Sequence, residues 1–188
     1  AAHPDRSHRW SQRRGLRVPA PIERLVDRAT LRDGIGADDA YLFFATSQRV
    51  VPSGAGPPLH NNSIARYTDL GEIWLYHNSM FNTGWARNLV SISNGRNFVP
   101  AVGCTLEALA NLGDLSVLAA REPGVGGTDW TRAIVHWRGH YFAVLDTVHA
   151  LTNGEFNLVC RWRSPNPAEL EKDAWVARAG SATLRIAT

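Results

Sequence analysis

The chain has 188 residues, of which 44% are hydrophobic and 20% charged, with a formal net charge of +3. This length fits one domain at roughly 100–200 residues per domain, and the balanced composition excludes a collagen, a coiled coil, a disulfide scaffold and a wholly disordered chain. No stretch approaches the roughly 20 apolar residues of a membrane helix, so we expect no membrane span. The first residues, AAHPDRSHRW, lack an apolar core and are not an intact signal peptide.

Positive charge is concentrated at the start of the chain. Residues 1–32 carry eight arginines against three acidic residues, a net charge of +5, whereas the remaining 156 residues have a net charge of −2. Residues 1–20 are also polar and aperiodic, which predicts a basic tail or interdomain linker before a domain at 21–188. Nucleic-acid binding needs clustered positive charge, so we expect none from this slightly acidic body.

The first part of the domain mixes several local patterns. Residues 21–32 (PIERLVDRATLR) fit a short helix after Pro21, and residues 33–39 (DGIGADD) have the composition of a loop. Residues 41–45 (YLFFA) have the length of a strand. Residues 51–58 (VPSGAGPP) cannot continue a regular element because of their prolines and glycines.

From residue 62 onward the pattern predicts one strand after another. The clearest pair is Trp130–Trp137 and Tyr141–Val148, joined by a turn at Arg138-Gly139. Residues 99–110 fit either a strand or a helix. Further strands are predicted within 64–67, 73–76, 89–92, 115–120, 156–162, 175–177 and 184–186. This series predicts an all-β fold, a large antiparallel β-sandwich with an irregular basic N-terminal segment.

The two cysteines, Cys104 and Cys160, each lie among alternating apolar residues. Neither belongs to a C-x-x-C pair, which excludes a zinc ribbon and a thioredoxin-like site. We predict two buried free thiols, with a disulfide as the alternative.

Several stretches resemble the C-terminal β-sandwich domain of heparinase II/III-like proteins. They include LRDGIGADDAYLFFA, RNLVSISNGR and EFNLVCRWR, and most specifically NSIARYTDLGEIWL and WTRAIVHWRGHYFAVLD. The resemblance covers residues 22–188. It implies a supersandwich-like domain of a polysaccharide lyase that works with an α/α-toroid domain on the same or another chain. It also implies an acidic polysaccharide, such as a glycosaminoglycan or alginate-like substrate, and a periplasmic or secreted protein.

The implied reaction is β-elimination on a uronic-acid polysaccharide by a carbon–oxygen lyase. Such a reaction needs a group that neutralises the uronate, a base that removes the neighbouring proton and an acid for the leaving oxygen. The candidate catalytic residues are His60, His77 and Tyr67, and the candidate substrate-binding residues are Asn62, Arg66, Arg87, Asn88 and Trp85. The isolated chain is expected to be inactive without a toroid. The alternative is a non-catalytic carbohydrate-binding or structural module.

Some family members bind zinc near the cleft, and the resemblance allows the corresponding positions to be compared. Aligning on Asn62-Ser63-Ile64 places Pro58, His60, His77 and Arg87 at the family's ligand positions. An arginine stays protonated and does not ligate metals, so we predict no metal and no cofactor, with a zinc held by two histidines as the alternative. Antiparallel pairing is expected to bring His60, Asn62, His77 and Arg87 to one end of the sheet, where Arg87 keeps a positive charge.

The remaining aromatic and histidine residues have simpler explanations. Most of the tryptophans are expected in the core, because large aromatic side chains are favoured in strands and dominate cores. Trp85 is the exception, because Asn82-Thr83-Gly84 places it in a loop. His136 and His140 flank the predicted hairpin turn, which favours a surface hairpin over a site.

Overall fold

The computed structural model describes residues 24–26, 28–46, 62–77, 88–95 and 104–187. These residues form fourteen β-strands, and no α-helix occurs among them. The strands are β1 (Leu25–Val26), β2 (Arg28–Arg32), β3 (Tyr41–Ala45), β4 (Ser63–Asp69), β5 (Glu72–Tyr76), β6 (Leu89–Ser93), β7 (Cys104–Leu112), β8 (Leu115–Val125), β9 (Thr128–Trp137), β10 (Tyr141–Ala150), β11 (Asn157–Arg161), β12 (Ala168–Glu171), β13 (Ala174–Ala179) and β14 (Ala182–Ala187). The described part therefore contains no helix able to cross a bilayer.

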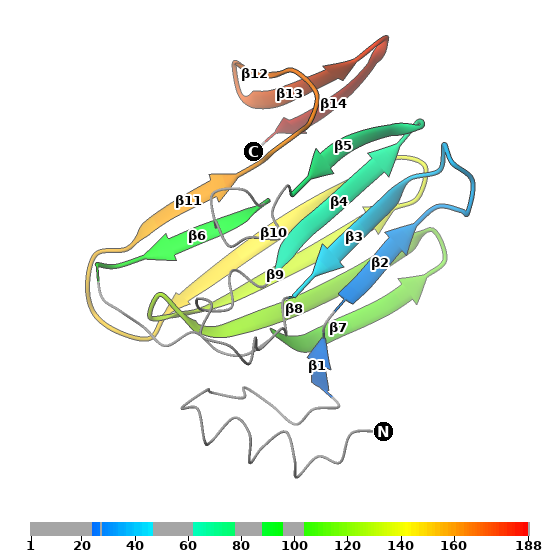
Figure 1. Cartoon of the computed structure of the whole chain (residues 1–188). Coiled ribbons are helices and arrows are strands. Elements are labelled where there is room, and N and C mark those ends of the chain that lie inside the picture. Colours follow the sequence, from blue (N-terminus) through cyan, green and yellow to red (C-terminus); the bar gives the residue numbers. More distant parts are fainter. Residues whose placement is uncertain (1–23, 27, 47–61, 78–87, 96–103, 188) are drawn as a thin grey trace, which may run out of the picture.

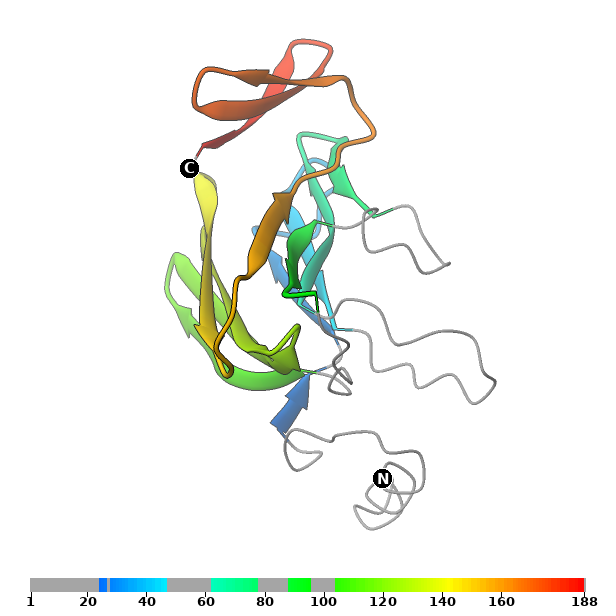
Figure 2. The same cartoon turned by 90° about the vertical axis from the view of Figure 1, so that its left-hand side faces the viewer.

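Two antiparallel sheets stack face to face and form the sandwich (Figures 1 and 2). One has the strand order β2-β3-β4-β5, and the other has the order β1-β7-β8-β9-β10. Their facing side chains form one core, with Leu42, Phe44 and Ile64 from the first sheet and Leu118 and Ile134 from the second. The predicted all-β sandwich is confirmed.

The second sheet shows why the sequence pattern is informative. In β9 the residues alternate between buried and partly exposed over the whole strand, as expected for a strand with one face on a core. Trp137 pairs with Tyr141 and Trp130 with Val148, so the predicted hairpin is confirmed. Its turn contains Gly139 with φ of 69°, a left-handed conformation that glycine adopts without steric cost.

Two smaller sheets complete the fold. The pair β6–β11 lies on the same side of the five-stranded sheet as β2–β5, and an isolated bridge between Ile64 and Asn88 connects the two (Figures 1 and 2). The three-stranded sheet β12-β13-β14 lies at one end of the sandwich (Figure 1). There Ala177 belongs to the main core, and Trp175, Leu184 and Ile186 pack against it.

Two sequence predictions are wrong. The short helix expected at 21–32 is absent from its described part, because residues 28–32 form β2 and pair with β3 from Arg28–Ala45 to Arg32–Tyr41. Pairing with a neighbouring strand overrides the local helix pattern there. Cys104 is buried as expected, but Cys160 is exposed because it lies on β11, in a two-stranded sheet. Both thiols are free. The ambiguous segment 99–110 enters β7 from Cys104 onward.

Candidate functional site

The described candidate residues Asn62, His77 and Asn88 come together at one end of the β4–β5 hairpin. The Ile64 amide donates to the Asn88 carbonyl at 3.2 Å, and the Asn88 side-chain amide donates to the Ile64 carbonyl at 3.1 Å. The His77 amide donates to the Ala65 carbonyl at 3.1 Å. The end of β5 therefore lies beside the start of β4, as antiparallel pairing predicts. His60, Trp85 and Arg87 lie outside the described residues.

Asn62, just before β4, connects the four-stranded sheet with the five-stranded sheet through hydrogen bonds at this end. Its φ of 63° is left-handed, a conformation in which asparagine is enriched among non-glycine residues. Its side-chain amide donates to the Ala120 carbonyl at 3.1 Å and to the Trp130 carbonyl at 3.4 Å. The residue has no exposed surface, so its side chain bonds the protein backbone and does not reach solvent in this structure.

Asn88 plays a similar part between β4 and the segment after β11. Its Oδ1 accepts a hydrogen bond from the Arg163 amide at 2.6 Å, while its amide group binds Ile64. Asn88 is fully buried as well. Its side chain thus fixes the relative position of three chain segments.

Arg132 is the charged centre of this region, and the sequence reasoning missed it. Its side chain is fully buried. Its Nη1 donates to the Asn62 carbonyl at 3.2 Å and to the Asn88 carbonyl at 2.9 Å. Its other nitrogens bind the carboxylate of Asp146, which also accepts a hydrogen bond from Trp130 Nε1 at 2.8 Å. The alternation of β9 was the available signal, because it places an arginine at a core position directly opposite an aspartate.

Tyr67 faces the interior, unlike its neighbour Arg66. Its hydroxyl donates to Asp69 Oδ2 at 2.9 Å, and its ring packs edge-on against Phe142 with 4.7 Å between centroids. Burial, and then the charge of Asp69, raise the pKa of Tyr67 well above its ordinary value. A base must lose its proton, so this environment opposes the role of Tyr67 as a general base in the described conformation.

Arg66 is exposed on the outer face of β4. It lies opposite Phe43 on one side and opposite Tyr76 on the other. Within the described part of the chain it has no hydrogen-bond or ion-pair partner. This guanidinium group is therefore available to an external anion.

A second polar cluster lies near the turn end of the hairpins, away from the Asn62 end of β4. His136 Nε2 lies 3.2 Å from Asp33 Oδ1, and Asp33 Oδ2 accepts a hydrogen bond from the Gly139 amide at 2.8 Å. Burial lowers the pKa of His136, and the charge of Asp33 partly opposes this effect. His136 is buried whereas His140 is exposed and its ring lies against Trp137, so the two histidines do not form one site.

Of the five described tryptophans, four lie in a core or pack against it, as expected, and one does not. Trp74 and Trp130 are buried, whereas Trp137 is 39% exposed on the outer face of the five-stranded sheet. Trp137 packs against Tyr141 with 5.5 Å between ring centroids. The sequence offered a weak signal for this, because Trp137 is the last strand residue before the turn.

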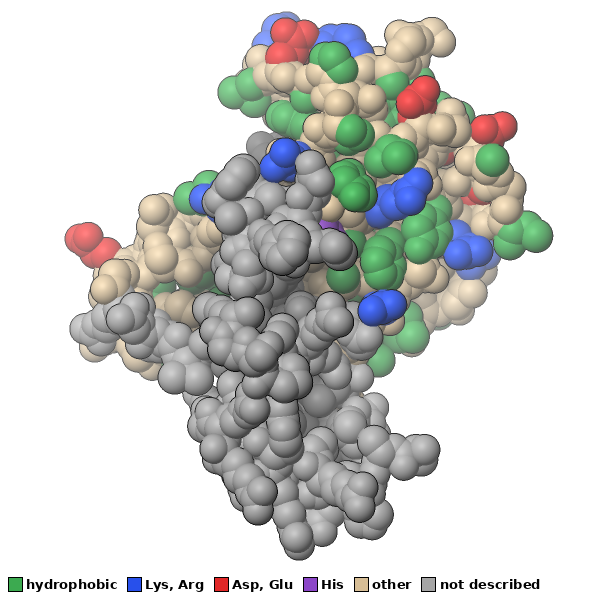
Figure 3. Space-filling model, in the orientation of Figure 1, with side chains coloured by type: hydrophobic (Ala, Val, Ile, Leu, Met, Phe, Trp, Pro, Cys, Tyr) green, Lys and Arg blue, Asp and Glu red, His purple; other side chains and the backbone are tan. Residues whose placement is uncertain are grey.

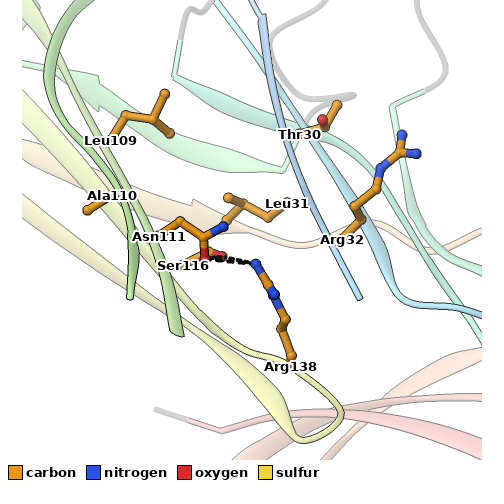
Figure 4. A pocket seen from close by; sticks show the side chains of 8 residues that line it. All are labelled: Thr30, Leu31, Arg32, Leu109, Ala110, Asn111, Ser116 and Arg138. Atoms are coloured by element: carbon orange, nitrogen blue, oxygen red, sulfur yellow. Dashed lines mark hydrogen bonds between the residues drawn. The ribbon is translucent and has the colours of Figure 1, made fainter. Parts of the chain in front are cut away.

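A pocket of about 410 Å³ opens between β2 and the β7–β8 hairpin (Figure 4). The guanidinium group of Arg138 points to Asn111, and its Nη2 donates to Asn111 Oδ1 at 2.8 Å and to Ser116 Oγ at 3.4 Å. None of the described candidate residues lines this pocket. It is therefore separate from the site predicted from the sequence.

The described residues offer no set of zinc ligands. Among the described residues, no three histidine, cysteine, aspartate or glutamate side chains form a group that could hold a metal ion. His77 is the one described candidate ligand, and an arginine, residue 87, stands at another ligand position. No chemical step is therefore assigned to a metal.

Comparison with known proteins places the fold. No protein-family model and no curated protein sequence matches the chain. Solved structures do match. A heparinase III structure has a TM-score of 0.62 at 14% sequence identity, over 88% of this chain and 28% of that one. A mutant of the heparan sulfate lyase HepC from Pedobacter heparinus has a TM-score of 0.60 at 13% identity, over 81% of this chain and 26% of that one.

A further heparinase III gene product has a TM-score of 0.60 at 11% identity, over 82% of this chain and 26% of that one. This chain thus spans about a quarter of the length of the structures that it matches. At these identities the likeness concerns the fold and not the chemistry. The chain has the fold of the β-sandwich domain of heparinase III.

Proposed function

We propose that this chain is the β-sandwich portion of a heparinase II/III-like polysaccharide lyase that acts on uronic-acid polysaccharides by β-elimination. The observation that carries this proposal is the fold match, which covers 81–88% of this chain but only 25–28% of the matching structures. The rest of such an enzyme, which we infer to be an α/α-toroid, would supply most of the catalytic groups. A periplasmic or secreted location is part of the same proposal.

The described residues support a division of labour with another domain. β-Elimination needs a neutralised uronate, a base and an acid. Arg66 supplies an exposed positive charge that suits the uronate carboxylate, and Arg87 is proposed for the same role. His77 and His60 stay candidates for proton transfer. Tyr67 stays a candidate only if its environment changes in the whole enzyme, because it is buried and bonded to Asp69 here.

The other predicted contacts divide into two groups. The buried hydrogen bonds of Asn62 and Asn88 support a positioning role at the strand ends that carry the site. A direct contact of these two residues with a saccharide, like one of Trp85, stays a prediction. No metal or cofactor enters this proposal.

A non-catalytic carbohydrate-binding module is the second candidate function. The specific observation that favours it is the contrast between Arg66, which is exposed and unpaired within the described residues, and Tyr67, which is buried. This arrangement offers a contact for an anionic glycan but no accessible tyrosine base.

One experiment tests both candidates. The purified chain is incubated with heparan sulfate, the ultraviolet absorbance of the unsaturated uronate product is followed, and binding is measured by calorimetry. We expect binding without product, and product only when a toroid domain is supplied. Turnover by this chain alone would contradict the need for a toroid. Absence of binding to heparan sulfate and to other acidic polysaccharides would contradict both functions.

A further inference from the structure

We infer that the outer face of the sheet β2-β3-β4-β5 is the surface on which an acidic polysaccharide docks. The inference rests on the proposed function and names the recognition surface. We call it the arginine–aromatic face, and it consists of Arg32, Tyr41, Phe43, Arg66 and Tyr76.

The register of the sheet places these residues side by side. In one row across the strands, Phe43 lies opposite Arg66, and Arg66 lies opposite Tyr76. In the next row, Arg32 lies opposite Tyr41, and its guanidinium group stacks on the Tyr41 ring at 5.1 Å from the centroid. Two strand spacings, or ~10 Å, separate β2 from β4, so the two cations can contact different anionic groups of one extended chain.

The charge of this face is not compensated, in contrast to most arginines elsewhere in the described part. Arg121, Arg178 and Arg185 each bind a carboxylate at 3.2 Å or less. Arg66 has no such partner among the described residues, and Arg32 has only the Tyr41 ring. An exposed guanidinium group without a carboxylate is suited to bind the carboxylate or sulfate of a ligand through its fork of N–H donors.

The acidic residues of these strands lie at the edge of the face. Of the residues in β2 to β5, only Asp69 and Glu72 are acidic, and both flank the β4–β5 turn. Figure 3 shows basic side chains interleaved with hydrophobic ones over the visible part of this face, with acidic side chains towards the periphery. The face therefore attracts a polyanion and does not repel it at its centre.

The aromatic rings supply the second half of the recognition. Tyr76 is 42% exposed, and Tyr41 and Phe43 are partly exposed between the arginines. An aromatic ring carries negative charge on its face, which complements the C–H groups on the flat side of a pyranose. A chain of sugar rings with anionic substituents matches such a mixed surface better than a simple anion does.

The test compares two double variants that remove the same charge. Arg32→Gln with Arg66→Gln removes the cations of the arginine–aromatic face, and Arg178→Gln with Arg185→Gln removes two exposed, ion-paired arginines of the three-stranded sheet. Binding of each to soluble heparan sulfate is measured by calorimetry, with neutral dextran as the control ligand and circular dichroism as the control of folding. The single variant Tyr76→Ala tests the aromatic contribution without any change of charge.

We expect the first double variant to bind about tenfold more weakly or worse, because two exposed charge-assisted contacts are lost, and the second to bind within about twofold of wild type. Tyr76→Ala is expected to weaken binding as well. Equal losses in both double variants would indicate unspecific charge attraction and overturn the inference. Wild-type binding that neither variant changes would overturn the docking surface alone, whereas no wild-type binding at all would overturn the proposed function as well.

Discussion

Arg132 and Asp146 lie opposite each other on β9 and β10, and the guanidinium group binds the carboxylate through two hydrogen bonds, Nε to Oδ1 at 2.8 Å and Nη2 to Oδ2 at 2.9 Å. The same guanidinium group binds the carbonyls of Asn62 and Asn88. One arginine thus connects the five-stranded sheet with the strand ends that carry the candidate site. This buried ion pair holds the backbone of Asn62 and Asn88 in place from the interior of the sandwich.

Replacement of Arg132 by Met is expected to destabilise the fold by ~3–5 kcal/mol, because it leaves Asp146 without its cationic partner and removes the Arg132 hydrogen bonds to the Asn62 and Asn88 carbonyls. Urea unfolding measures this loss. The matched control is Arg178→Met, which breaks only exposed ion pairs and is expected to change stability by less than ~1 kcal/mol. Similar losses in the two variants would contradict the connecting role of Arg132.

Tyr67 is expected to resist ionisation. Burial and Asp69 raise its pKa well above the ordinary tyrosine value, so its phenolate forms only when the protein unfolds. Spectrophotometric titration of the four tyrosines measures this, and the Tyr67→Phe variant identifies the resistant group. The variant should leave the titration of the folded protein unchanged. The prediction would be refuted if the folded variant showed one fewer tyrosine ionising in the ordinary pH range than the folded wild type does.

His136 is expected to weaken the fold in mild acid. Burial keeps its pKa below the ordinary histidine value, against the opposing charges of Asp33 and Asp69 and with the help of Arg138. The unfolded chain therefore binds a proton that the folded chain does not, and stability falls as the pH drops from ~6.5 towards the lower folded value. Thermal unfolding between pH 7 and mildly acidic pH measures this fall.

The variant His136→Gln should flatten this part of the pH profile. His140→Gln is the control, because His140 is exposed, and it should leave the slope as it is in the wild type. If His140→Gln flattens the pH profile of stability and His136→Gln does not, the prediction for His136 is contradicted.

The two cysteines are expected to differ in reactivity towards a thiol reagent. Cys104 is buried and burial raises its pKa, so it should react only when the protein unfolds. Cys160 is exposed and should react in the folded protein, although more slowly than the amino acid cysteine in solution, because partial loss of hydration raises the pKa of its thiol too. Reaction with Ellman's reagent, with Cys160→Ser as the comparison, checks this order. If the folded Cys160→Ser variant released one equivalent of thionitrobenzoate, Cys104 would be reactive in the folded protein and the expected order would be contradicted.

The sequence predicts the fold where neighbours along the chain are also neighbours in space. The hairpin of β9 and β10 follows from its alternation and its turn, and the approach of His77 to the start of β4 follows from antiparallel pairing. Of the cluster expected from His60, Asn62, His77 and Arg87, the structure describes Asn62 and His77. The helix expected at 21–32 is wrong because the partner of β2 lies across a loop, and local pattern does not encode that pairing.

The burial of the site residues could not be predicted from the local sequence pattern either, because it depends on contacts with distant parts of the chain. Asn62 binds the Ala120 carbonyl, 58 residues away, and Arg132 binds the Asn62 carbonyl, 70 residues away. An asparagine at the start of a strand looks the same in sequence whether it contacts a ligand or a distant backbone. Arg132 could have been found, because a charged residue at an inward position of a strand predicts a buried partner.

The order in which strands pair has a consequence for the synthesis of this protein. β1 pairs with β7 through Leu25 and Thr105, and β6 pairs with β11 through Leu89 and Arg161. In a nascent chain that has not yet reached residue 157, the edge of β6 that later pairs with β11 is therefore unpaired. Because distant pairings must close before they contribute stability, this topology folds slowly, on the order of milliseconds to seconds. During translation the edge of β6 is the point at which a chaperone or a second chain can intercept the molecule.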